Sequence, residues 1–229
     1  MNRTTALYRV LGCMAYGEWK AHETARREAD EAHDEEERRR WQRVAAEELG
    51  HHKLFVRRLK ALGGDPERAM RPFRATFDRV HAAVPQDDFG LAVHNYVGEG
   101  IAYDILQWLR RVVDEETAGA IERVIADEDE HEGNAAEHLR ALMGDDPELR
   151  AQAGRVARTT IASHLESGRL APLTAFGSFF AVGRPLTLVQ VMVGGFARRM
   201  WAIGLTPTGQ PVPGILRPAS ASRQPAEAA

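Results

Sequence analysis

Apolar residues recur every three or four positions along most of the chain, which is the pattern of amphipathic helices. The first such stretch covers about residues 6–32, and the second covers about residues 34–62. Asp34, followed three residues later by Glu37, has the spacing of a capping box at a helix start. The Gly-Gly-Asp-Pro run at 63–66 ends the second stretch. We therefore expect two antiparallel helices joined near residue 33.

A second pair of helical stretches follows at about 87–113 and 115–143, with Asp114 as the expected N-cap of the later helix. Between the two pairs, residues 65–88 contain three prolines that break any long helix. Apolar residues in this connection keep a short helical period, so we expect it to lie on the bundle. The pattern predicts an all-α fold, a four-helix bundle with a crossover between its second and third helices.

The remaining residues fall into two parts. A fifth helix is expected at 147–167, and the mostly apolar stretch 170–197 is interrupted by Arg184-Pro185. Neither half of that stretch reaches the roughly 20 apolar residues that a bilayer span requires, so we expect a helical hairpin packed on protein and no membrane span. We divide the chain into the bundle at 5–143, additional C-terminal helices at 144–205, and a flexible tail at 206–229.

One motif carries candidate chemistry. Glu48 and His51 stand three residues apart, so they share one face of a helix and can hold one cation between them. A single Glu-x-x-His is weak evidence, but the motif returns at Glu128 and His131. A further Glu lies well upstream of each copy, and these residues complete the ligand set of a dinuclear carboxylate bundle: Glu18, Glu48, His51, Glu99, Glu128 and His131.

The turn positions support this register. In an antiparallel hairpin, residues equidistant from the turn lie level with each other. The midpoint of Glu18 and Glu48 is residue 33, and the midpoint of Glu99 and Glu128 falls at 113–114, next to the expected caps. Glu23, a rival ligand on the first helix, fits less well. We expect Glu48 and Glu128 to bridge two metals, with Glu18 and Glu99 as terminal ligands.

Neighbours of the ligands follow from helical spacing. His22 and Tyr103 stand four residues after the two upstream Glu residues, and Glu23 and Asp104 stand five residues after them. A ligating histidine normally donates its free N–H to a carboxylate, and we expect Glu23 or Asp104 to accept it. The residues beside the motifs, including Glu47 and Asp127, are expected to face solvent.

Composition narrows the chemistry. The single cysteine excludes an intramolecular disulfide and any site with several Cys ligands, and it favours a reducing, cytoplasmic location. Carboxylates with one imidazole per metal suit iron, or manganese, better than zinc. The net charge is −3, and the basic excess of the C-terminal part is too dilute for a nucleic-acid footprint.

Three stretches carry a resemblance to a known family: residues 46–52, the Tyr-Val-Gly-Glu-Gly run at 96–100, and Glu128 with His131. Together they resemble the ferritin-like di-iron superfamily, and its tRNA-hydroxylase (MiaE-like) branch in particular, over roughly residues 5–143. The resemblance implies two iron ions, O2 and an external electron donor such as a ferredoxin or a flavoprotein reductase. It also implies tRNA as a candidate partner, through hydroxylation of an isopentenyl-adenosine nucleoside, and a homodimer is compatible with it.

Two function classes remain open. The first is a di-iron oxygenase, a hydroxylase that acts on tRNA or on a small molecule. The alternative is iron handling or peroxide reduction, as in ferritins and rubrerythrins. The absence of a Cys-x-x-Cys module argues against a rubrerythrin, and we favour the oxygenase.

Overall fold

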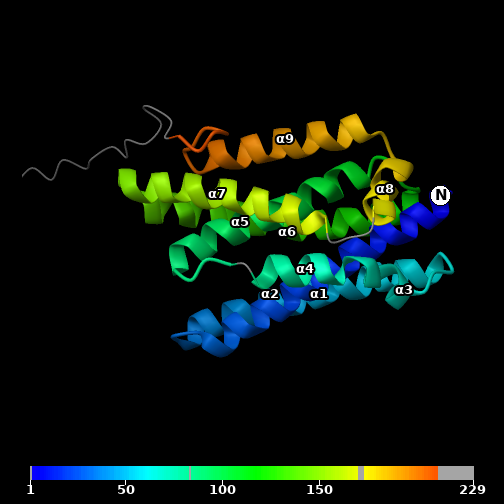
Figure 1. The fold of residues 1–229 in the computed structure, drawn as a ribbon. Helices are drawn as coiled ribbons and strands as arrows, with labels where there is room; N and C mark the ends of the chain where they lie inside the picture. The colour runs from blue at the N-terminus through cyan, green and yellow to red at the C-terminus, as the bar shows by residue number, and fades with distance from the viewer. Residues whose placement is uncertain (1, 83, 170–172, 211–229) are drawn as a thin grey trace, which may run out of the picture.

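Two long helical hairpins form the body of the molecule. The computed structural model describes residues 2–82, 84–169 and 173–210, and regular structure within these ranges is entirely helical. The first hairpin pairs α1 (Arg3–Glu31) with α2 (Glu35–Ala61), and the second pairs α5 (Asp88–Leu109) with α6 (Glu115–Met143). The hairpins meet where α2 contacts α6 (Figure 1). This arrangement confirms the predicted all-α bundle.

The caps lie where the sequence placed them. The Asp34 side chain accepts a hydrogen bond from the Glu37 amide at 2.8 Å, and Asp114 accepts one from the Thr117 amide at 3.0 Å. Buried Arg58 of α2 also donates to Asp114, at 2.7 Å, which ties the end of α2 to the start of α6. The third bundle helix ends at Leu109, four residues earlier than expected, because residues 110–113 form the turn.

The crossover consists of α3 (Pro66–Met70), the 3₁₀ turn η1 (Arg71–Phe73) and α4 (Arg74–Ala82), all against the bundle. The Phe73 side chain is buried in the main core, and a side chain at Gly12 of α1 would overlap the backbone of Ala69. This close approach holds the crossover on α1, as its apolar period predicted.

Three further helices cover the bundle: α7 (Pro147–Gly168), α8 (Leu173–Val182) and α9 (Pro185–Ala202). Helix α8 packs on α1, while α7 and α9 pack on α5 (Figure 1). Among the described helices, none combines the length and apolar character needed to cross a membrane. Of the tail predicted at 206–229, residues 206–210 contact α7 through a 2.9 Å bond from Arg158 to the Thr208 carbonyl. Residues 211–229 lie outside the described residues.

A buried ion pair fixes α9 against α5. The Arg199 side chain is 1% exposed and binds both carboxylate oxygens of Asp104, which is equally buried. Side chains at Gly100 or Gly195 would overlap these two partners, so the glycines are what allow the helices to approach this closely. The outer face of α9 carries the exposed residues Leu186, Val189 and Val193.

Two histidine rings, His94 of α5 and His164 of α7, lie next to each other where these helices meet. His94 is 6% exposed and its Nδ1 lies 3.1 Å from the Thr160 hydroxyl, while His164 Nδ1 donates to the Thr160 carbonyl at 2.8 Å. Burial, and then the nearby His164, lower the pKa of His94 to about 4. His81 of α4 adds to this group, and burial lowers its pKa to about 4 as well.

These shifts predict an acid-sensitive fold. Because the folded-state pKa of His94 lies below its unfolded value, its contribution to stability is complete above about pH 6.5 and is lost as the pH falls toward 4. By about pH 5 the free energy of unfolding should have dropped by about 2 kcal/mol through this residue alone. Urea unfolding of the protein and of His94→Gln, measured above about pH 6.5 and at about pH 5, checks this drop. An equal drop in the variant would contradict it.

Candidate metal centre

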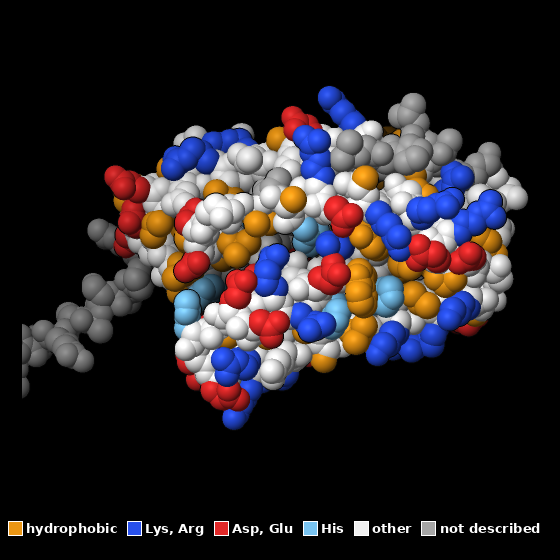
Figure 2. Space-filling view, turned by 60° about the horizontal axis from the view of Figure 1, so that its bottom comes forward, with side chains coloured by type: hydrophobic (Ala, Val, Ile, Leu, Met, Phe, Trp, Pro, Cys, Tyr) orange, Lys and Arg blue, Asp and Glu red, His pale blue; other side chains and the backbone are white. Residues whose placement is uncertain are grey.

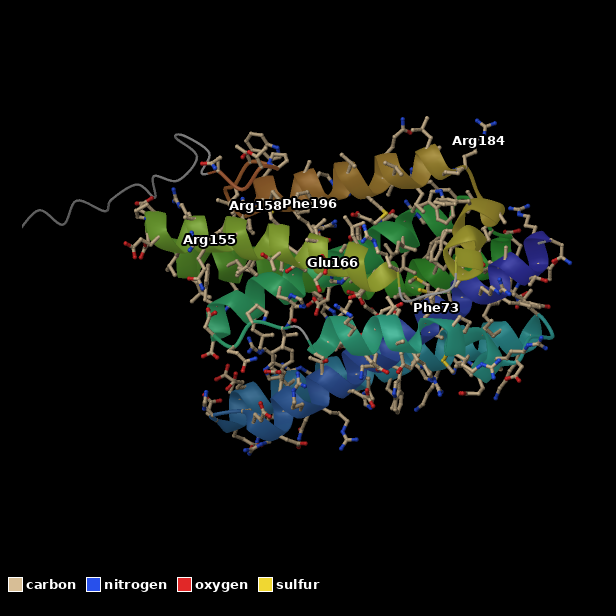
Figure 3. All side chains as sticks on the ribbon, viewed as in Figure 1. Phe73, Arg155, Arg158, Glu166, Arg184 and Phe196 are labelled. Carbon is tan, nitrogen blue, oxygen red and sulfur yellow. The ribbon has the colours of Figure 1, made fainter. Side chains whose placement is uncertain are left out.

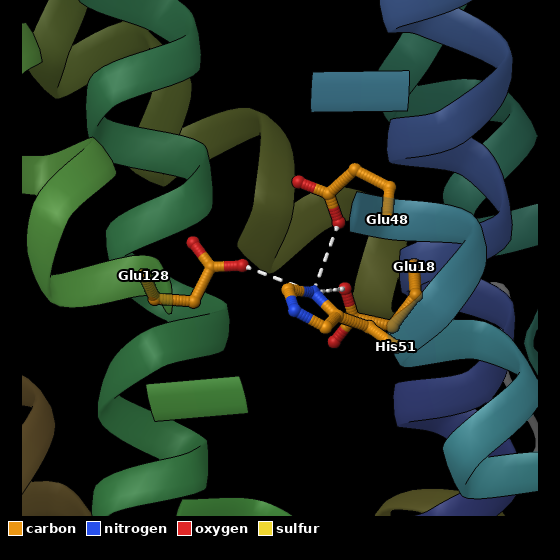
Figure 4. A group of neighbouring side chains, drawn as sticks. All are labelled: Glu18, Glu48, His51 and Glu128. Carbon is orange, nitrogen blue, oxygen red and sulfur yellow. Dashed lines mark ion pairs between the residues drawn. The ribbon is translucent and has the colours of Figure 1, made fainter. Parts of the chain in front are cut away.

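Four side chains from three helices converge inside the bundle (Figure 4). Glu18 comes from α1, Glu48 and His51 come from α2, and Glu128 comes from α6. Each offers one ligand atom, and these atoms lie within 4.8 Å of one another. His51 Nδ1 is at the centre, 3.7 Å from Glu18, 3.6 Å from Glu48 and 3.6 Å from Glu128.

The other nitrogen of His51 fixes how the ring is presented. His51 Nε2 lies 2.9 Å from an Asp127 carboxylate oxygen, which can only accept, so Nε2 carries the proton and donates. Nδ1 then faces the three Glu carboxylates. Both His51 Nδ1 and Glu48 Oε2 are buried without a hydrogen-bond partner. Buried polar atoms are normally paired, and a cation between these donors would satisfy both of them.

The second motif repeats this arrangement in a more open setting. His131 Nδ1 lies 3.8 Å from the second oxygen of Glu128, and its Nε2 lies 3.0 Å from Glu47. The acceptors are reciprocal: the residue before Glu128 holds the histidine of α2, and the residue before Glu48 holds the histidine of α6. Each hairpin therefore orients the imidazole of the other.

Glu99, the remaining predicted ligand, lies outside the cluster of four. It lines a cavity of about 10 Å³, room for about one water, together with Glu128, Glu132 and Tyr103. Burial, and then the charges of Glu128 and Glu48, raise the pKa of Glu99. Glu99 is exposed, unlike the buried Glu48. The structure thus groups Glu18, Glu48, His51 and Glu128. His131 and Glu99 also lie near Glu128, but they are more exposed to solvent than the buried members of the cluster.

The pKa values of the cluster are shifted because several acids lie close together and are buried from water. Burial raises the pKa of Glu18 and Glu48, to about 8 for Glu48, and His51 only partly offsets this. Burial lowers the pKa of His51, but Glu18 and Glu48 outweigh it and raise the value to about 11. Protons are thus retained among these groups, and a cation would take their place.

Three of the four residues expected to support the ligands have partners elsewhere. His22 Nδ1 donates to the Ala45 carbonyl at 2.7 Å, which joins α1 to α2, and Glu23 pairs with Lys20 at 2.7 Å on the surface. Asp104 is occupied by Arg199. Neither Glu23 nor Asp104 accepts from a motif histidine. Tyr103 does border the site, because it lines the cavity of Glu99, and its hydroxyl donates to Asp129.

The sequence analysis did not identify Asp127 and Glu47 as partners of the motif histidines, because we expected both residues to face solvent. Both are half exposed at the side chain, as helix periodicity indicated, yet their carboxylates reach across the interface to the opposite histidine. A signal was present, because an acid stands immediately before the Glu of both motifs. Only the spacing between the hairpins shows that each acid serves the other half.

The chain was compared with known proteins. A model of a ferritin-like domain family of actinomycetes matches residues 2–169. The chain belongs to this family. Among solved structures, it is similar to a protein from Synechococcus with aldehyde deformylating oxidase activity, at 19% identity and a TM-score of 0.71. The match covers 90% of this chain and 93% of the other, which shows a shared fold. No curated protein sequence gave a significant match.

The reciprocal pairs give a prediction. If the cluster holds a metal, Asp127→Ala and Glu47→Ala should each weaken metal binding by about 10- to 100-fold, because each removes the acid that orients one histidine. Glu130→Ala is a matched control: it removes the same charge from α6 at an exposed position. Isothermal titration with Fe²⁺ under anaerobic conditions measures the affinities. An equal loss in Glu130→Ala would show that only the net charge matters.

Proposed function

We propose that this protein is a di-iron oxygenase that oxidises a small organic molecule with O2 and electrons from a separate reductase. Glu18, Glu48, His51, Glu99, Glu128 and His131 would hold the metals, with Glu48 and Glu128 shared between them. The observation that carries the proposal is the set of buried, unpartnered ligand atoms at His51 and Glu48, within a cluster of acids that a cation would stabilise.

The residues around the ligands have distinct tasks. Asp127 and Glu47 hold the Nε2 protons of His51 and His131, which keeps each Nδ1 lone pair directed inward. On one side Phe55 and Leu59 belong to a fully buried core that keeps water from the cluster. On the other side, Glu99 and Tyr103 border the small cavity beside Glu128. The bound iron ions would supply the redox chemistry with O2.

The choice of a small molecule rests on the surface. Acidic and basic side chains are intermixed, with histidines between them, on the face drawn in Figure 2. Acidic side chains lie beside many of the basic ones on this face, and the net charge of the chain is −3, which does not favour binding to a phosphate backbone. The tRNA reading is tested directly by mass spectrometry of modified nucleosides from a deletion strain. Because a protein of the same fold has aldehyde deformylating oxidase activity, an aldehyde is a sensible first compound in substrate assays.

The metal assignment predicts stoichiometry. The purified protein should hold about two iron or manganese atoms per chain, and Glu48→Ala should lose both, since it removes a ligand shared by the two metals. Glu23→Ala, which removes an acid of α1 paired with Lys20, is the control and should keep them. Elemental analysis measures the content. Full metal content in Glu48→Ala would sink the assignment.

The activity predicts how O2 is used. With reductant, the iron-loaded protein should consume O2, and Glu48→Ala should lose at least about 99% of the rate, as removal of a ligand that forms the reactive centre does. An O2 electrode measures this beside a peroxide-consumption assay. Rapid peroxide removal without substrate-dependent O2 uptake would favour the peroxide-reducing alternative and overturn the oxygenase.

A further inference from the structure

A second, larger hollow lies next to the candidate metal centre. This cleft has a volume of about 510 Å³ and lies between α5 and α9. Tyr103, Gln107 and Arg111 line it from α5 and the turn that follows, and Thr187, Gln190 and Arg198 line it from α9. Its volume falls within the range of small-molecule sites.

The charge of the cleft is one-sided. Its lining contains two guanidinium groups, hydroxyls, amides and the apolar side chain of Val191, and it contains no carboxylate. No ion pair joins Arg111 to another residue of the described ranges. Arg198 lies 3.8 Å from Asp104, but both oxygens of Asp104 are bound by Arg199, and the Arg198 side chain is 64% exposed. Guanidinium groups bind carboxylates and phosphates through paired N–H donors.

Tyr103 connects the cleft to the metal centre. It lines both the cleft and the cavity that contains Glu99 and Glu128. Its ring is held at the hydroxyl, which donates to Asp129 and accepts from Gln107 Nε2 at 2.7 Å. Because Tyr103 follows Glu99 by four residues, one helical turn of α5 separates the cleft from Glu99, a proposed metal ligand.

The wall made by α9 is firmly placed. Arg199, next to Arg198, is buried in the ion pair with Asp104, and Gly195 allows the helices to touch. The two arginines of the cleft are thus presented from elements fixed against each other, and little order has to be gained on binding.

We propose that this cleft is an anion-binding site that holds the carboxylate or phosphate group of the substrate, with Tyr103 between the bound anion and Glu99. Arg111 and Arg198 are the residues that bind the anion and select for it. The inference rests on the proposed oxygenase function and names its substrate class, a small organic anion.

Two pairs of probes test the site by isothermal titration with the full-length protein. Adenosine 5′-monophosphate is compared with adenosine, and decanoate is compared with decanol. In at least one pair the charged member should bind about tenfold more tightly than its neutral partner. The phosphate pair and the carboxylate pair then distinguish which anionic group the cleft prefers.

Substitutions locate the binding. Arg111→Gln and Arg198→Gln should each lower the affinity for the charged probe by about tenfold, because each removes a guanidinium contact. Arg155→Gln is the matched control, since Arg155 is an exposed arginine of α7 away from the cleft (Figure 3). Melting temperatures confirm that the variants fold. If Arg198→Gln does not, Arg111→Gln gives the same test from outside the helices.

The titrations are run on metal-loaded and on metal-free protein. Because no cleft residue is a proposed metal ligand, the charged probe should bind to both forms. The inference is overturned if neither charged probe binds more tightly than its neutral partner, or if the cleft variants bind as tightly as Arg155→Gln. Anion binding in a protein that takes up no iron would retain the anion site and refute only the oxygenase. Iron-dependent O2 uptake without anion binding would refute only the cleft.

Discussion

The structure depends on holding three carboxylates and one imidazole, with ligand atoms within 4.8 Å of one another, inside a helical bundle. Like charges repel at this distance, and burial removes the water that would screen them. The surrounding structure must therefore supply the stability that the cluster lacks. It does so with long capped helices and with a buried apolar core next to the cluster that includes Leu11, Phe55 and Ile121. This cost also explains why a cation fits the site, since it converts repulsion among the acids into ligation.

The two hairpins contribute equivalent parts to this centre, and neither part is complete by itself. Each supplies a Glu-x-x-His motif and the acid that holds the histidine of the other, through Asp127 and Glu47. Docking of α2 on α6 is thus a condition for orienting both imidazoles. The bond from Arg58 to Asp114, the N-cap of α6, links the same two helices near the end of the bundle. The alignment of α2 with α6 near the end of the bundle therefore also determines how the candidate ligands of the two helices lie relative to each other.

The sequence predicted the helices, their caps at Asp34 and Asp114, and the convergence of Glu18 with Glu48 because these features depend on local periodicity and on distance from a turn. It did not predict the acceptors of the histidine protons, since those contacts depend on how far apart two hairpins pack. Asp104 shows the same limit. Its helical position is equivalent to that of Glu23, yet one pairs with a buried arginine more than ninety residues away and the other with a surface lysine.

The C-terminal helices contribute side chains next to the candidate metal centre. The family match ends at residue 169, whereas α9 supplies Arg199 and one wall of the cleft. Arg199 Nη1 lies 3.6 Å from Glu132, which follows His131 and lines the cavity beside Glu99. Removing one partner of the ion pair between Arg199 and Asp104 by substitution would leave the other charge buried and unpaired, at a cost of about 3–5 kcal/mol. The proposed ligands thus come from the matched domain, while one wall of the proposed anion site comes from the segment that follows it, so on this proposal substitutions in α9 can change substrate selection without touching the ligands.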